Sequence, residues 1–156
     1  MTIKTLESYA PFELISDAAS LGLATTTVSS PLGTCVARHP PRRRSTRATL
    51  FLHGAAGSWT TWTPLVQAAV ADRIDLGDIV IFDLPGWGDA HLADGPLDDP
   101  VLAICSLVKD MAEELGYTEW DLVGHSLGGF IALHMASIWP QAVLSVGMVS
   151  GTTFSI

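Results

Sequence analysis

The sequence of 156 residues has few cysteines and few basic residues. Only Cys35 and Cys105 occur, so neither a disulfide framework nor a metal site is expected. Lysine and arginine number 8 against 16 aspartates and glutamates, which gives a formal net charge of -8. Nucleic acid and anionic membranes attract basic surfaces, so this balance argues against both as partners.

Long apolar stretches are also lacking. No segment is long enough to span a bilayer. The first residues include Lys4, Glu7, Glu13 and Asp17 and have no apolar core of signal-peptide length, so we expect a cytoplasmic protein. The sequence has no internal repeat or low-complexity tract, and its apolar content suffices for the core of one domain.

Five of the eight basic residues fall in one stretch around Pro40-Pro41. We interpret this stretch as a charged loop in contact with solvent, and a phosphate-binding or partner-binding patch is the alternative. The residues are Arg38, Arg42, Arg43, Arg44 and Arg47.

Three regions follow one another along the chain. Residues 1–22 form an N-terminal extension, and residues 23–40 predict a β-hairpin, because two β-rich stretches flank a turn. From 46 to 152 strands alternate with helices, and apolar runs such as 48–52 suit a sheet that is covered on both faces. We therefore predict an α/β fold with a mostly parallel sheet and helices on both faces.

The most informative segment is Gly124-His125-Ser126-Leu127-Gly128, which an apolar strand enters and a helix pattern leaves. This context predicts a nucleophile elbow, a sharp turn that lifts a serine hydroxyl above the sheet. The flanking residues are glycines because a side chain at either position would clash. Ser126 is accordingly the predicted nucleophile.

A serine nucleophile needs hydrogen-bond donors for the oxyanion that forms when it attacks a carbonyl group. The backbone N–H of Leu127, at the start of the helix, is one expected donor. The second is expected from the small, glycine-rich segment 53–57, with Ala55 favoured and Ala56 as the alternative.

Three segments together resemble the α/β-hydrolase fold family in their order and spacing: 50–54 with Ser58 and Trp59 beyond it, 82–88, and 124–129. The resemblance covers about residues 20 to 152. It implies a serine hydrolase that acts through an acyl-enzyme, most commonly on a small-molecule ester, with Ser126 as nucleophile and Ala55 and Leu127 as the oxyanion hole. No cofactor is expected. Asp83 resembles a residue that stabilises a loop at a strand end.

A serine at the elbow also speaks against the branches of this family that use aspartate there, namely the haloalkane dehalogenases and the epoxide hydrolases. Large aromatic residues usually serve the core. Trp87 and then Trp59 are the exceptions that we assign to the substrate pocket, because Trp87 follows a strand at the edge that holds Ser126 and Trp59 follows the oxyanion segment.

In this fold the catalytic acid and then the histidine follow the serine in the sequence. From Leu127 to Ile156 there is no Asp or Glu, and the only histidine is His134. His134 lies about 12 Å along the helix from Ser126, too far for a hydrogen bond. His53 is expected to shape the strand end, His125 to diverge from Ser126, and two histidines to lie in solvated loops: His39 and His91.

We therefore expect residues 1–156 to be one partial α/β-hydrolase domain, the amino-terminal half of a serine hydrolase that stops after the strand following the nucleophile helix. Alone, it should show little or no turnover. Its apolar last strand, 143–149, should bind the missing half or associate with itself through the exposed edge. The alternatives are a non-catalytic binding module and one chain of a split enzyme.

Overall fold

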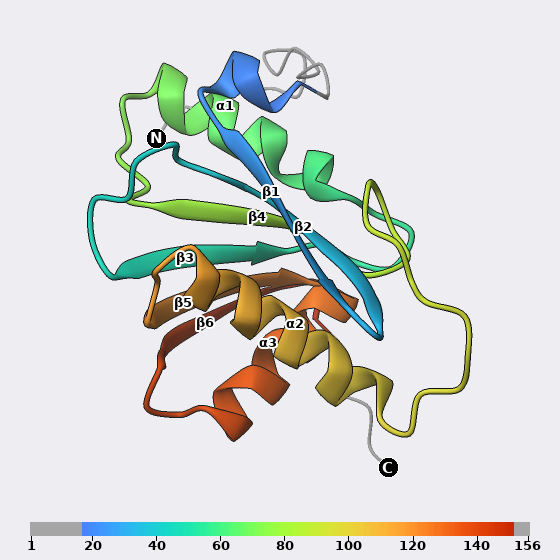
Figure 1. Ribbon diagram of the computed structural model, residues 1–156. Coiled ribbons are helices and arrows are strands. Elements are labelled where there is room, and N and C mark those ends of the chain that lie inside the picture. Colours follow the sequence, from blue (N-terminus) through green and yellow to red (C-terminus); the bar gives the residue numbers. More distant parts are fainter. Residues whose placement is uncertain (1–16, 152–156) are drawn as a thin grey trace.

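The computed structural model describes residues 17–151, and most of the predicted N-terminal extension lies outside these residues. A six-stranded sheet in the order β1-β2-β4-β3-β5-β6 forms its centre (Figure 1). The strands are β1 (Ala24–Ser30), β2 (Gly33–His39), β3 (Arg47–Leu52), β4 (Ile79–Asp83), β5 (Glu119–His125) and β6 (Val143–Val149).

Two pairing modes occur in this sheet. β1 and β2 form an antiparallel hairpin, and β2 runs antiparallel to β4. β3 lies parallel to both β4 and β5, and β5 lies parallel to β6. Leu50 at the centre of β3 is in register with Val80 on one side and Leu122 on the other. The predicted mostly parallel α/β class is confirmed.

Helices cover both faces of the sheet, with α1 on one side and α2 and α3 on the other (Figure 1). α2 begins as the sequence predicts, with Pro100 in its first turn and the Asp99 carboxylate accepting the N–H of Leu102 at 2.9 Å. The helices are α1 (Thr63–Ala71), α2 (Pro100–Glu114) and α3 (Leu127–Ile138), with short 3-10 helices η2 (Ala18–Leu21) and η3 (Trp59–Trp62).

Successive strand residues point to opposite faces and so feed two cores. Leu50 and Val80 belong to the core beneath α2 and α3. Phe51 and Ile81, their neighbours in sequence, belong to the core beneath α1 and η3. The continuous apolar runs of β3 and β4 are thus explained by burial on both sides.

β6 forms the apolar edge of the described sheet. It pairs with β5 on one side, while Leu144 and Val149 remain 46% and 49% exposed. β1, at the opposite edge, has the polar residues Thr25, Thr27 and Ser29 as its exposed positions.

The prediction of a charged, solvent-exposed loop is wrong for Arg38. This residue lies within β2, and its side chain is only 3% exposed, because it pairs with the buried carboxylate of Asp83. Arg47 begins β3, and Arg44 of the intervening segment binds Asp75 and Asp78. These three arginines serve the fold, so the stretch is not one uniform solvated patch.

Candidate active site

Ser126 occupies the sharp turn between β5 and α3. Its backbone has φ 50 and ψ -113, a conformation that is costly for any residue other than glycine. The surrounding structure holds it there: the N–H of Ser126 donates to the carbonyl of Val149 in β6 at 3.1 Å, and its own carbonyl accepts from Gly129 at 3.0 Å.

The two flanking glycines lie where backbone segments meet. A Cβ on Gly124 would overlap the carbonyl of Gly128, and a Cβ on Gly128 would overlap the carbonyl of Leu52 at the end of β3. The clashes that explain the glycine spacing in the sequence are therefore present. The contact with Leu52 also fixes the first turn of α3 against β3.

The segment that follows β3, His53–Ser58, lies beside Ser126 and is called the oxyanion loop below. A Cβ on Gly54 would lie 3.2 Å from the Cβ of Ser126 and 2.7 Å from Nδ1 of His125. The N–H of Gly57 donates to the carbonyl of Gly54 at 3.0 Å, which closes a turn with Ala55 and Ala56 at its exposed tip. Ala56 has a positive φ of 58.

Three backbone donors border this region. In the described part of the chain, the N–H groups of Ala55, Ala56 and Leu127 donate to no protein acceptor. The N–H of Leu127 is at the amino end of α3, where the helix dipole adds positive potential. The geometry thus brings the predicted nucleophile next to the segment that carries its predicted oxyanion donors.

His53 is fully buried and both of its ring nitrogens are engaged. The N–H of Leu84 donates to Nε2 at 3.0 Å, so Nε2 carries no proton. The proton is then on Nδ1, which donates to the carbonyl of Gly54 at 2.7 Å. Burial lowers the pKa of His53, which keeps the ring neutral. This residue shapes the strand end, in agreement with the expectation.

The remaining histidines take different positions. Nδ1 of His134 lies 3.1 Å from the carbonyl of Phe130, one turn back in α3. The prediction of a solvated loop is wrong for His39, which ends β2 with Nε2 2.9 Å from the hydroxyl of Thr26. His91 is exposed. His125 borders Gly54, the same residue that Ser126 borders, so it faces the oxyanion loop.

The two tryptophans assigned to the substrate pocket have unlike surroundings. Trp87 is half-buried in the loop after β4, with its ring 6.1 Å from that of His53. Trp59 is only 4% exposed and packs in the core beneath α1. Its N–H donates to Asp83, and the guanidinium of Arg38 lies 4.8 Å from its ring centroid.

Asp83, at the end of β4, is the buried acid nearest to the oxyanion loop. Its carboxylate accepts Nη1 of Arg38 at 2.6 Å, the N–H of Trp59 at 2.7 Å and the N–H of Asp89 at 3.0 Å. Arg38 also pairs with the side chain of Asp89. The sequence resemblance predicts Asp83 as a loop stabiliser, but it gives no role to Arg38, whose one signal is a charge that directly follows the apolar residues 35–37.

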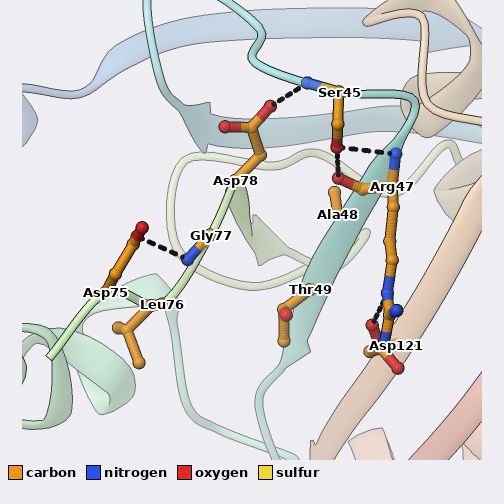
Figure 2. A pocket seen from close by; sticks show the side chains of 9 residues that line it. All are labelled: Ser45, Arg47, Ala48, Thr49, Asp75, Leu76, Gly77, Asp78 and Asp121. Atoms are coloured by element: carbon orange, nitrogen blue, oxygen red, sulfur yellow. Dashed lines mark hydrogen bonds and ion pairs between the residues drawn. The ribbon is translucent and has the colours of Figure 1, made fainter.

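Two hollows flank opposite ends of the sheet. One, of about 450 Å³, borders the oxyanion loop and is lined by Ala56, Gly57, Ser58, Thr60, Thr61 and Gly88. The other, of about 300 Å³, lies at the amino ends of the strands (Figure 2). There Arg47 binds Asp121 at 2.6 Å, a hydrogen bond that lowers the pKa of this carboxyl, and the N–H of Ser45 donates to Asp78. Its carboxylates are therefore structural ion-pair partners.

Within residues 17–151, no three histidine, cysteine or acidic side chains are grouped so that they could hold a metal ion. Nor is any helix there both long enough and apolar enough to cross a membrane. Both cysteines are buried and free, and burial raises the pKa of each thiol, to about 12 for Cys105.

Comparison with known proteins identifies the family. The profile described as "Alpha/beta hydrolase family" matches residues 49–154, well over half of the chain. The chain belongs to the alpha/beta hydrolase family. This family member contains the elbow, the oxyanion loop and the end of β4 within the matched residues.

Named relatives of this alpha/beta hydrolase have diverse functions. It is 34% identical over 111 residues to the dihydrolipoyllysine-residue acetyltransferase component of the acetoin cleaving system of Cupriavidus necator, covering 67% of this chain and 26% of that protein. It is 28% identical over 105 residues to epoxide hydrolase 4 of Mus musculus, and this match covers 65% of this chain and 27% of that protein. The chain thus spans about a quarter of the length of these relatives.

The fold likeness extends to solved structures. A bacterial virulence factor described as a membrane phospholipase A superposes with a TM-score of 0.71 at 22% identity. The match covers 88% of this chain and 43% of that one. At this identity the likeness concerns the fold.

Proposed function

We propose that this chain supplies the nucleophile and the oxyanion hole of a serine hydrolase that acts on small-molecule carboxylic esters. The main support is the arrangement at Ser126: a serine held in a costly backbone conformation, beside a turn whose tip has N–H groups that donate to no acceptor among residues 17–151. Such strain persists only where the surrounding structure maintains it, and it is concentrated at functional sites. A non-catalytic binding module gives no reason for it.

The reaction follows from the chemistry of these groups. The hydroxyl oxygen of Ser126 attacks the ester carbonyl carbon, and the carbonyl oxygen gains negative charge. The N–H groups of Leu127 and Ala55, or Ala56 in its place, donate to that oxyanion. The intermediate expels the alcohol and leaves an acyl group on Ser126, and water then releases the acid. Trp87, beside the loop, is the proposed substrate contact; Trp59 supports the loop from the core.

Both steps need a base for the proton of Ser126 or of water. The ring nitrogens of His53 are both engaged, and Nδ1 of His134 lies against its own helix. His125 borders Gly54, but no carboxylate among the described residues binds its ring and orients it as a base. We therefore propose that a further polypeptide segment, packed beside β6, provides the histidine and the acid. For the 156-residue chain alone we expect little turnover, because residual catalysis without a triad is several orders of magnitude weaker.

Epoxide opening is the main competing chemistry, since relatives from Mus musculus and Homo sapiens are both named epoxide hydrolase 4. The resemblance described above assigns an aspartate nucleophile to that branch, and this chain has Ser126 at that position. An attack by serine on a carbonyl carbon uses both the elbow and the oxyanion donors. We therefore favour acyl chemistry.

A fluorophosphonate probe, with imidazole added to the buffer in place of the absent base, tests the nucleophile without requiring turnover. The probe should add once per chain at Ser126, as read by intact mass and peptide mapping. Ser126→Ala should abolish the addition, and Ser145→Ala, in neighbouring β6 with an exposed hydroxyl that donates to Asp121, should leave it unchanged. Equal labelling of the wild type and Ser126→Ala would refute the proposal.

A further inference from the structure

The two ends of the oxyanion loop are attached to two adjacent residues at the end of β4, one to Leu84 and the other to Asp83. At the amino end, Leu84 donates to His53, which in turn donates to the carbonyl of Gly54. At the carboxyl end, the N–H of Trp59 donates to Oδ1 of Asp83 at 2.7 Å. The turn that carries Ala55 and Ala56 is therefore suspended between two anchors on adjacent residues.

The second anchor depends on a buried charge. The side chain of Asp83 is fully buried, and Arg38 is its only cationic partner among the described residues, with Nη1 2.6 Å from Oδ2. Removing one partner of a buried ion pair leaves an uncompensated charge, which the protein relieves by rearranging or by admitting water. Either response would loosen the N–H of Trp59.

Arg38 holds this region through more than one contact. Its guanidinium pairs with Asp83 and Asp89 and also lies over the ring of Trp59, the first residue after the oxyanion loop. The N–H of Asp89 donates to the same carboxylate, which ties the Trp87 loop to this network. The planar guanidinium suits this combination of two carboxylates and a ring face, which a lysine ammonium cannot reproduce.

We infer that Arg38 is a positioning residue for the reaction proposed at Ser126. Acting through Asp83, it fixes the carboxyl end of the oxyanion loop and thereby sets where the N–H groups of Ala55 and Ala56 lie relative to Ser126. Arg38 contacts no reacting atom. Its effect arises because oxyanion donors stabilise charge only when they are held in place beforehand. This inference rests on the proposed function for its catalytic consequence.

The chain provides a matched control in Arg44. Nε of Arg44 lies 2.9 Å from Oδ1 of Asp78, a buried carboxylate that directly precedes β4. This pair also joins an arginine to a buried aspartate of the same strand region, but it lies at the amino end of the sheet, away from Ser126. Arg44→Met should lower stability and leave the oxyanion loop unchanged.

The experiment compares Arg38→Met, Arg38→Lys and Arg44→Met with the wild type under conditions in which each is folded. NMR hydrogen exchange of the Trp59 and Asp89 amides measures the anchor, and the rate of fluorophosphonate addition measures Ser126. For Arg38→Met we expect exchange at both amides at least about tenfold faster than global stability explains, and addition at least about tenfold slower. Arg38→Lys should show smaller changes of the same kind. Arg44→Met should change neither the exchange of these two amides, once corrected for global stability, nor the rate of probe addition.

Several outcomes are decisive. Equal effects of Arg38→Met and Arg44→Met at the same stability would overturn the inference and leave Arg38 a purely stabilising residue. If Arg38→Met does not fold, Arg38→Lys, which keeps the countercharge, decides: wild-type exchange and addition rates would refute positioning. If the wild type takes up no probe even with imidazole present, the proposed function fails, and amide exchange still determines whether Arg38 anchors the loop.

Discussion

The backbone N–H of Leu84 donates to Nε2 of His53 over 3.0 Å, which assigns the imidazole proton to Nδ1. Nδ1 in turn donates to the carbonyl of Gly54 at 2.7 Å. A protonated ring would have to place a second proton on Nε2, opposite the N–H of Leu84. Together with burial, this arrangement holds the histidine beside the oxyanion loop in its neutral form.

The neutral state of His53 predicts a loss of stability in mild acid. Burial lowers its pKa in the folded chain below the ordinary value of about 6.5, so between these two values the unfolded chain binds the extra proton. The contribution of neutral His53 to the free energy of unfolding is fully present above about pH 6.5 and is lost as the pH falls toward the pKa of His53 in the folded chain. Urea unfolding from pH 8 to 5 should show this decline, and His53→Asn should reduce it. His91→Asn, at an exposed site, should keep the wild-type slope; an unchanged slope in His53→Asn would count against the assignment.

Gly128 and Gly129, two adjacent glycines in the first turn of α3, should differ sharply in their tolerance of a methyl group. In Gly128→Ala the Cβ would meet the backbone carbonyl of Leu52, which cannot move without disturbing β3. We expect a loss of more than about 2 kcal/mol in the free energy of unfolding. Gly129→Ala is the control, because its Cβ would lie 3.3 Å from the flexible Met148 side chain, and it should cost much less. Denaturant midpoints at constant m-value provide the comparison, and equal losses would contradict the packing described.

Ser126 itself should be a stability liability. Its φ of 50 with ψ -113 is costly for a side-chain-bearing residue and accessible to glycine. Ser126→Gly should therefore be more stable than Ser126→Ala by about 1 kcal/mol, although glycine increases the entropy of the unfolded chain. Thermal unfolding of the two variants measures the difference. A more stable alanine variant would show that the strain is absent in solution.

The elements that sequence reasoning located are those encoded by local patterns. β3 and β4 are mostly apolar runs, and the spacing of Gly124 and Gly128 indicates a tight strand-to-helix turn because an apolar strand precedes it and a helix pattern follows it. Arg38 could not be interpreted in this way, because its partner Asp83 is 45 positions away and the two meet only when β2 pairs with β4. A charge beside two prolines favours a loop by composition, and the long-range pairing overrides that preference.

The exposed apolar edge predicts self-association of this chain. β6 leaves Leu144 and Val149 about half exposed beside a row of backbone groups that no strand pairs within residues 17–151, and such edges template contacts with other chains. Sedimentation velocity should show an average mass that rises with concentration. Leu144→Lys and Val149→Lys should each reduce this rise, because an edge lysine opposes strand addition. Thr27→Lys, on the polar edge strand β1, is the control and should leave it unchanged. A wild-type chain that stays monomeric at every concentration would mean that the edge is protected by other means.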